Sequence, residues 1–281
     1  MKITKKAAAL MAIGVVTLCT SLAVYAARKT ITVKGSDTMV ILAQRWAEKY
    51  MTIDSTITIQ VTGGGSGVGI SALINGTTDI CDASRPMKKS EKDKLMKKYN
   101  TAGVEIPVAR DGITLYANEK NPVTELSLDQ IKAIYLGEIK NWKDIGGPDA
   151  KIIVYGRENS SGTFEFFRDE VLKGADYSPL VQSLPGTAAI VNAVANDING
   201  IGYGGAAYAK GVKQIKVRKD ASTPGYEPTR QTIASGQYPI SRYLYMYTRN
   251  KPAGEMKAYI DWILSAEGQS IVTDVGYFPL K

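Results

Sequence analysis

Apolar residues follow two periodicities that alternate along the chain. Short alternating or continuous apolar runs, which are typical of strands, precede stretches in which apolar residues recur three and four positions apart, as in helices. Such pairs of predicted strand and helix lie at 30–34 and 39–50, 57–61 and 70–75, and 152–155 and 162–172. This succession predicts an α/β fold built on parallel sheets.

A serine or threonine stands at the helix start in each of these three strand-to-helix loops. The residues are Ser36 and Thr38, then Ser66, and then Ser161 and Thr163. A helix start has unpaired N–H groups and a partial positive charge, so it attracts anions. Because ligands of such sheets lie beyond the carboxyl ends of the strands, we expect the three loops to converge. Together they would surround a small anion with neutral donors.

The third loop adds a cation. Arg157 lies between the predicted strand and a helix that Ser160 or Ser161 caps, and its planar guanidinium fits a tetrahedral oxyanion at two points. Two simpler interpretations stay open, an ordinary capped helix at 157–163 and a plain tight turn at the glycine-rich 63–69. The glycine-rich turn lacks the glycine spacing and the Gly-Lys-Ser/Thr signature of nucleotide-binding loops.

Two extended segments, 104–109 and 113–117, flank the polar pair Arg110 and Asp111. Extended segments of this kind suit a chain that crosses between domains, and the predicted strand 243–248 suits the return crossing. An interior Asp111 would need a partner, because an unpaired buried carboxylate is costly. A surface turn at Asp111 is the alternative.

The first 26 residues have the composition of a secretory signal. Three lysines precede an apolar run, and small residues stand at both positions that a signal peptidase reads before its cut after Ala26. The apolar run is short and interrupted for a retained membrane anchor, and Leu18 before Cys19 disfavours a lipoprotein signal. We therefore expect a periplasmic or otherwise exported protein. Cleavage removes three lysines and no acids, so the formal charge falls from +8 to +5.

Composition excludes several classes of chemistry. The chain is 44% hydrophobic and 22% charged, as expected for a globular protein, and it has no histidine. Histidine-dependent catalytic triads and histidine metal sites are therefore excluded. No arginine-rich or aromatic-basic cluster predicts a nucleic-acid partner. Cys81, the one cysteine left after cleavage, is expected to be a small buried hydrophobe. We expect no catalytic residue, metal or cofactor.

Seven stretches occur in the order seen in one known family. They lie at 35–38, 64–69, 79–85, 137–147, 157–163, 200–203 and 238–242. In these stretches the chain resembles the phosphate-binding proteins that serve bacterial phosphate ABC importers. The resemblance covers essentially the whole mature chain. Its most specific parts are the Asn-Trp to Gly-Gly stretch at 141–147 and the Arg to Thr stretch at 157–163.

The resemblance implies two α/β domains with the type II periplasmic-binding-protein fold, joined by two hinge crossings and closing over one phosphate. The first lobe would comprise residues 27–112 and 241–281, and the second lobe residues 113–240. Carried over by position, the phosphate ligands would be Thr38 (hydroxyl and backbone N–H), Met39 (backbone N–H), Ser66 (hydroxyl), Arg157 (cation), and Ser161, Gly162 and Thr163 (helix-start donors). Ser36 is a further candidate.

One position departs from the family pattern. Some members have an aspartate after the strand that contains Asp79, and this aspartate accepts the phosphate proton; counting along the chain puts Arg85 there. Such a carboxylate helps to reject sulfate, which has no proton to donate at neutral pH. We hypothesise that Asp111 supplies the acceptor, with Asp82 as the lesser candidate. Arg85 is either a second cation of the site or a salt-bridge partner.

We therefore expect a non-catalytic, monomeric receptor that captures inorganic phosphate and delivers it to the membrane permease of an ABC importer. A receptor for another oxyanion, such as sulfate or molybdate, is one rival, and a phosphate sensor that docks on a signalling partner is another. A phosphoryl-transfer enzyme that uses Ser66 or Ser161 is a third. The lack of histidine and of a clear carboxylate metal cluster disfavours the enzyme.

Overall fold

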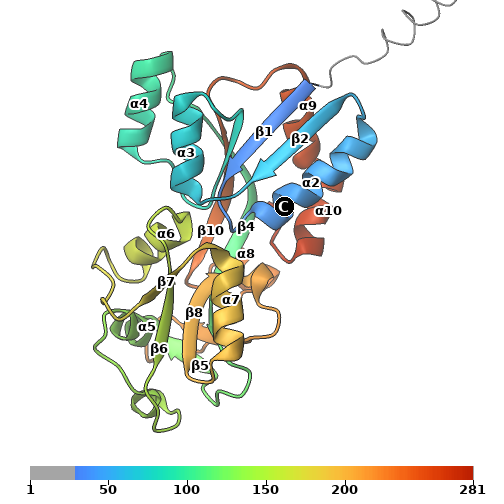
Figure 1. Cartoon of the computed structure of the whole chain (residues 1–281). Helices are drawn as coiled ribbons and strands as arrows, with labels where there is room; N and C mark the ends of the chain where they lie inside the picture. The colour runs from blue at the N-terminus through green and yellow to red at the C-terminus, as the bar shows by residue number, and fades with distance from the viewer. Residues whose placement is uncertain (1–28, 281) are drawn as a thin grey trace, which may run out of the picture.

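The computed structural model describes residues 29–280, which form two lobes connected by two strands (Figure 1). The predicted signal at 1–26 lies outside the described residues. Lobe 1 contains β1 (Lys29–Gly35), α2 (Val40–Ile53), β2 (Ile57–Thr62), α3 (Ser66–Asn75), β3 (Ile80–Ala83), α4 (Lys89–Tyr99), α9 (Gly254–Ile263) and α10 (Ala266–Val275). Across residues 29–280, no helix is both long and apolar enough to pass through a membrane.

Lobe 2 lies below lobe 1 in Figure 1, and its helix α6 lies on the side that faces lobe 1. Its elements are β5 (Glu125–Ser127), α5 (Leu128–Tyr135), η1 (Trp142–Ile145), β6 (Ile153–Arg157), α6 (Gly162–Glu170), β7 (Gln182–Leu184), α7 (Gly186–Asn196), β8 (Gly200–Gly205), η2 (Ala206–Tyr208), β9 (Lys213–Arg218) and α8 (Arg230–Ala234). The strands β4 (Val104–Ala117) and β10 (Ser241–Thr248) connect the lobes.

Within residues 29–280 the strands form a mixed sheet with the path β2-β1-β3-β10-β4-β8-β6-β7, from which β5 and β9 branch. In lobe 1, β1 pairs parallel with β2 and β3, and in lobe 2, β6 pairs parallel with β7 and β8. The expectation of parallel sheets is wrong at the crossings, where β10 runs antiparallel to β3 and β4. The reason is that the chain leaves lobe 1 on β4 and returns on β10, so the two strands run in opposite directions.

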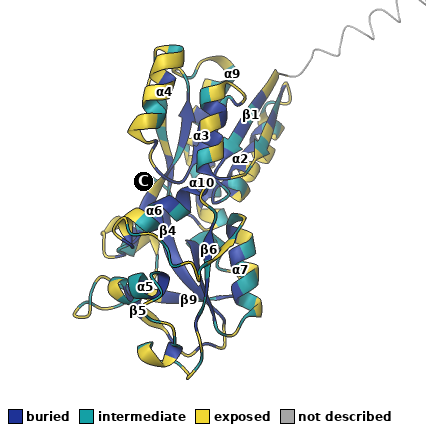
Figure 2. Ribbon diagram, turned by 60° about the vertical axis from the view of Figure 1, so that its left-hand side comes forward, coloured by how far each residue is buried: buried dark blue, intermediate teal, exposed yellow. Residues whose placement is uncertain are grey.

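The strand β4 continues without a break through the polar pair that the sequence placed between two segments. Asp111 and Gly112 pair with Arg242 and Ser241 of β10. Residues on either side enter different hydrophobic cores, because Val108 and Ala109 pack in lobe 1 whereas Ile113, Leu115 and Ala117 pack in lobe 2. Each lobe therefore has its own core on the same strand. Figure 2 shows the buried strands at the centre and exposed helix faces, such as that of α4, at the periphery.

The helix predicted over 70–75 starts earlier in the structure. The helix expected from residue 70 begins at Ser66, because Gly65 adopts a positive φ of 94° and turns the chain directly into α3. Ser66 therefore lies in the first helical turn. The sequence did not predict the short strands β5 and β7.

Candidate functional site

The three serine- and threonine-bearing loops meet where lobe 1 faces lobe 2. The hydroxyl of Thr38, after β1, lies 2.9 Å from the hydroxyl of Thr163, in the first turn of α6. Ser66, at the start of α3, approaches α6 so closely that a Cβ added at Gly162 would collide with its Oγ. All of these side chains are buried. The loops therefore bring neutral donors from both lobes together.

The start of α6 is built by a serine cap. The Oγ of Ser161 accepts hydrogen bonds from the backbone N–H groups of Thr163 (3.1 Å) and Phe164 (3.3 Å), so Ser161 rather than Ser160 is the N-cap. Ser160 has a different role, because its carbonyl accepts the N–H of Gly67 from lobe 1 at 3.0 Å. The Ser161 hydroxyl hydrogen stays available to donate, since the cap uses only the oxygen.

Arg157 ends β6 and is buried, with 2% of its surface exposed. Its Nη1 donates to the hydroxyl of Thr187 at 2.8 Å, and its Nη2 pairs with the Asp37 carboxylate of lobe 1 at 3.1 Å. The Nε of Arg157 has no hydrogen-bond partner among residues 29–280. The guanidinium thus reaches across the lobe boundary and retains donor capacity. Sequence reasoning did not select Asp37 or Thr187.

The loop before α2 is held by a turn of its own, by the backbone of β3 and by the side chain of Tyr277. The N–H of Met39 donates to the carbonyl of Ser36 at 2.9 Å, and the N–H of Ser36 donates to the carbonyl of Asp82 at 2.9 Å. The hydroxyl of Tyr277 donates to the carbonyl of Thr38. These bonds fix the position of the Thr38 side chain. The Met39 amide, which the resemblance assigned to phosphate, is engaged in the turn.

Ser84 is a further hydroxyl of the cluster that sequence reasoning missed. Its N–H donates to the Oγ of Ser66 at 3.0 Å, and the two hydroxyl oxygens lie 3.2 Å apart. Ser84 is fully buried and follows β3, which pairs with β1. The rule that ligands lie beyond the carboxyl ends of adjacent parallel strands would have selected Ser84 from its position after a strand.

Asp111 is fully buried and forms an ion pair with Arg242 on the neighbouring strand. Arg242 Nη2 and Nε lie 2.9 and 3.2 Å from Asp111 Oδ2, and the same Nη2 donates to the Thr163 hydroxyl at 2.9 Å. Burial raises the pKa of Asp111, against the opposing effect of Arg242, and burial lowers the pKa of Arg242. Arg242 therefore stands between Asp111 and the hydroxyl cluster. Sequence reasoning did not select Arg242 as a site residue, although it lies in the family stretch 238–242.

Asp82, the lesser candidate for the proton acceptor, lies in β3 with 2% of its surface exposed. Burial raises the pKa of its carboxyl to about 8, and among residues 29–280 its Oδ1 has no hydrogen-bond partner. A carboxyl with this pKa holds its own proton at neutral pH, so it is a poor acceptor for a second one. Burial also raises the pKa of the neighbouring Cys81 thiol, which is buried as expected.

Arg85 is a salt-bridge partner in this structure, which is one of the two roles that its position left open. Its Nη1 and Nη2 bind both carboxylate oxygens of Glu91 at 2.9 and 2.8 Å. Its Nε lies 2.9 Å from Glu165 Oε2 on α6 of lobe 2, which also pairs with Lys88 at 2.7 Å. We call Arg85, Lys88, Glu91 and Glu165 the interlobe ion cluster. The two acids balance the charge of Arg85, although its Nε, like that of Arg157, makes no hydrogen bond among residues 29–280.

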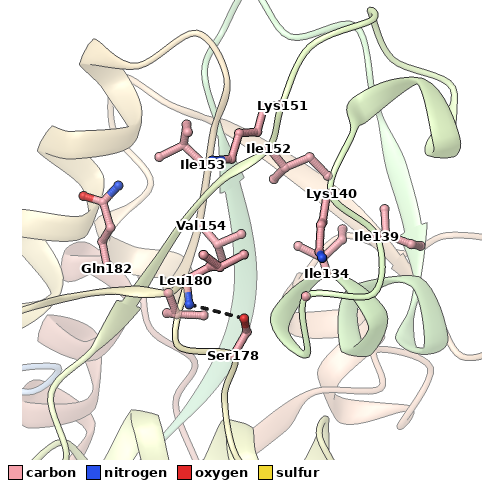
Figure 3. A pocket seen from close by; sticks show the side chains of 12 residues that line it. Ile134, Ile139, Lys140, Lys151, Ile152, Ile153, Val154, Ser178, Leu180 and Gln182 are labelled. Carbon is pink, nitrogen blue, oxygen red and sulfur yellow. Dashed lines mark hydrogen bonds between the residues drawn. The ribbon is translucent and has the colours of Figure 1, made fainter.

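A small cavity of about 80 Å³ in lobe 2 is a separate feature (Figure 3). Its walls are mostly aliphatic, including Ile134, Ile152 and Leu180, and Lys140 lies at one side. Lys151, Ser178 and Gln182 also line it, but none of the candidate phosphate ligands does. Because none of the three serine- and threonine-bearing loops lines this cavity, we place the candidate site at the lobe boundary.

Comparisons with known proteins concern the family and the fold of the chain. The family model of the PBP superfamily domain matches residues 22–267. The phosphate-binding protein PstS of Pseudomonas aeruginosa is 34% identical over 263 residues, which are 88% of this chain and 81% of the relative. The chain belongs to the PstS family. The PstS protein of Staphylococcus haemolyticus is 35% identical over 254 residues, which cover 87% of this chain and 79% of the relative. The predicted family is confirmed.

Two solved structures are similar to this PstS-family chain over most of their length. One, from Clostridium perfringens, is described as a phosphate ABC transporter substrate-binding protein with bound phosphate; its TM-score is 0.82 at 32% identity, covering 90% of this chain and 100% of that one. The other is an ABC-type phosphate transport receptor from Vibrio cholerae, with a TM-score of 0.71 at 31% identity, covering 88% and 99%. The predicted two-lobed α/β fold is confirmed. These relatives are substrate-binding transport proteins rather than enzymes.

Proposed function

We propose that this chain is a receptor that binds inorganic phosphate between its lobes and delivers it to the membrane permease of an ABC importer. The observation that carries the proposal is the meeting of hydroxyls from both lobes, with Thr38 and Thr163 2.9 Å apart and Ser66 packed against Gly162. Because the donors come from both lobes, an anion bound there would hold the lobes together. The PstS relatives, one with bound phosphate in its structure, support the choice of ligand.

Neutral donors and one cation would replace the water shell of the phosphate. The proposed ligands are Thr38, Met39, Ser66, Arg157, Ser161, Gly162 and Thr163, with Ser36 as a further candidate and Ser84 added by its contact with Ser66. The α6 start contributes its partial positive charge. The Met39 amide is the weakest member, since it already donates to Ser36 within the turn.

The proposed lobes comprise residues 27–112 with 241–281, and residues 113–240. The division of β4 between two cores, after Ala109 and before Ile113, supports the boundary at 112. Closure would be a hinge motion at β4 and β10, as in other two-lobed binding proteins. We further propose that the chain is a monomer, that it is exported with a signal cleaved after Ala26, and that it catalyses no reaction.

Calorimetric titration of the mature chain with phosphate, arsenate and sulfate tests this function. We expect one phosphate per chain and much weaker binding of sulfate. An absence of phosphate binding would contradict the proposal, and tighter binding of sulfate would favour the rival oxyanion receptor. Turnover of a chromogenic phosphoester that is lost in Ser161→Ala would instead favour the enzyme.

The proton acceptor needs its own test, since the hypothesis names Asp111 and the structure pairs this residue with Arg242. If Asp111 accepts the phosphate proton, directly or through a shift of that pair, Asp111→Asn loses phosphate affinity and loses the preference over sulfate. Unchanged affinity and unchanged preference would contradict the role of Asp111.

A further inference from the structure

The ion pair of Asp111 and Arg242 lies where the lobes are joined. The two residues are direct partners in the pairing of β4 with β10, the strands that cross between the lobes. Asp111 is fully buried and Arg242 is 7% exposed. Residues on the crossing strands are adjacent to both lobes. A side chain there can therefore contact the hydroxyl groups at the lobe boundary although it lies on neither of the helices that carry them.

Three contacts fix the Arg242 guanidinium. Asp111 Oδ2 binds its Nη2 and Nε, the Thr163 hydroxyl accepts from Nη2 at 2.9 Å, and the Phe166 ring of α6 lies under the guanidinium carbon, 5.2 Å from its centroid. Two of these partners, Thr163 and Phe166, belong to α6. The pair on the crossing strands is thereby tied to the helix start that the proposed function assigns to phosphate.

Donor and acceptor roles at Thr163 follow from the chemistry of arginine. A guanidinium has five N–H donors and no acceptor, so the Thr163 oxygen must accept in its contact with Arg242. The hydroxyl hydrogen of Thr163 is then directed away from Arg242. The hydroxyl of Thr38 on the opposite lobe lies 2.9 Å away, and either of the two hydroxyls can donate in that contact. Without Arg242 the same hydroxyl could present either its hydrogen or its lone pairs to the cleft.

We infer that Arg242, held by Asp111, is a positioning residue that keeps the Thr163 hydroxyl oriented as a hydrogen-bond donor toward the bound anion. The inference rests on the proposed phosphate-binding function. It assigns to the pair a task that its ionic bond alone does not explain, since a buried ion pair is often no more stabilising than apolar residues of the same size. The paired charges cancel, so the pair of Asp111 and Arg242 contributes orientation rather than net charge.

The inference also defines what the Thr163 position selects. A hydroxyl fixed as a donor binds an oxygen that carries no proton and disfavours one that does, because two donors facing each other leave both unsatisfied. Thr163 therefore contacts a deprotonated phosphate oxygen, and the protonated oxygen must lie elsewhere in the site.

A double-mutant cycle measured by phosphate titration tests this positioning role. The neutral-pair variant combines Asp111→Asn with Arg242→Gln, which avoids an unpaired buried charge, and the second site is Thr163→Val. We expect the neutral-pair variant and Thr163→Val each to weaken phosphate binding about tenfold. When Thr163→Val is already present, adding the neutral pair should weaken phosphate binding less than twofold further. In a Thr163→Ser background, which restores the hydroxyl, the tenfold loss returns.

Equal losses in the threonine and valine backgrounds would overturn the inference, because the pair would then act on the fold or directly on the anion, with Arg242 as a ligand or Asp111 as the proton acceptor, rather than through Thr163. Unchanged binding in the neutral-pair variant would overturn it too. Arg242→Lys provides a second variant if the neutral pair does not fold, since it keeps a charge for Asp111 but loses the fork that also reaches Thr163. Wild-type affinity in Arg242→Lys contradicts the positioning role.

The matched control is Arg168→Gln with Asp169→Asn, an exposed pair on the same helix, for which we expect unchanged affinity. A wild-type chain that binds no phosphate would contradict the proposed function itself, which distinguishes that failure from a failure of the positioning role.

Discussion

Two regions bring the lobes together, and they differ in the kind of group that each lobe presents. The central region joins Thr38, Ser66, Thr163 and the Arg157–Asp37 pair through hydroxyls and one incompletely occupied guanidinium. The peripheral interlobe ion cluster joins Arg85 and Lys88 of lobe 1 to Glu165 of lobe 2 through fixed charges.

The difference shows which cation a ligand can use. All three nitrogens of the Arg85 guanidinium face acids of the protein, two toward Glu91 and one toward Glu165. Arg157 pairs with one carboxylate only, that of Asp37, and its other hydrogen-bonded nitrogen contacts the neutral Thr187. An arginine near a helix start is therefore a better ligand candidate when fewer carboxylates of the protein pair with it. The hydroxyls of the central region can exchange partners with an anion, whereas the acids of the cluster repel one.

The largest effect is expected from Arg157→Gln. This change removes the central cation and its charge-assisted hydrogen bonds, each of which is worth about 1.5–3 kcal/mol, so phosphate affinity should fall on the order of 100-fold. Calorimetric titration measures the loss. A change smaller than threefold would show that the central region does not depend on its guanidinium.

The next effect concerns the interlobe ion cluster. Arg85→Gln combined with Glu165→Gln removes one charge of each sign, so the net charge near the site is kept while the ionic contact across the lobes is lost. We expect phosphate to dissociate about tenfold faster in stopped-flow experiments, with a weaker dependence on salt, because these buried charges favour the closed form.

The preference for phosphate over sulfate should not change in this variant, since none of these side chains is a proposed ligand. A shifted preference would place the cluster in the binding site. Asp149→Asn is the control, because it breaks an exposed pair with Lys143 within lobe 2 and should leave dissociation unchanged.

Ser84→Ala tests the hydroxyl that was added to the central region. The N–H that Ser84 donates to Ser66 is kept and only the neutral hydroxyl is lost, so we expect roughly fivefold weaker phosphate binding, equivalent to about 1 kcal/mol. Ser178→Ala, at the lobe 2 cavity, is the matched control and should bind phosphate normally. Wild-type affinity in Ser84→Ala would remove Ser84 from the site.

The smallest effect is expected from Lys88→Ala. The Lys88 side chain is 48% exposed although its ammonium lies 2.7 Å from Glu165 Oε2. Solvent screens such a pair, so the phosphate dissociation rate should rise less than twofold. A rise above fivefold would mean that the exposed lysine, rather than the buried Arg85, carries the ionic contact between the lobes.

Local patterns were sufficient to predict the three loops, because strand periodicity, helix periodicity and capping residues are all written within a few residues of Thr38, Ser66 and Thr163. The pairing of Asp111 with Arg242 was not predictable in this way, since 131 residues separate them and strand register brings them together. The antiparallel crossings were missed for the same reason. Arg85 shows the opposite case. Its sequence position suggests a phosphate ligand, whereas in the folded chain its guanidinium pairs with Glu91 and Glu165.

The claim that phosphate binds between the two lobes is tested most directly by a crystal structure of the mature chain with phosphate. The account predicts one phosphate that receives hydrogen bonds from Thr38 and Ser66 of lobe 1 and from Thr163 and Arg157 of lobe 2. A phosphate bound to residues of one lobe alone, or bound away from these four side chains, would contradict it.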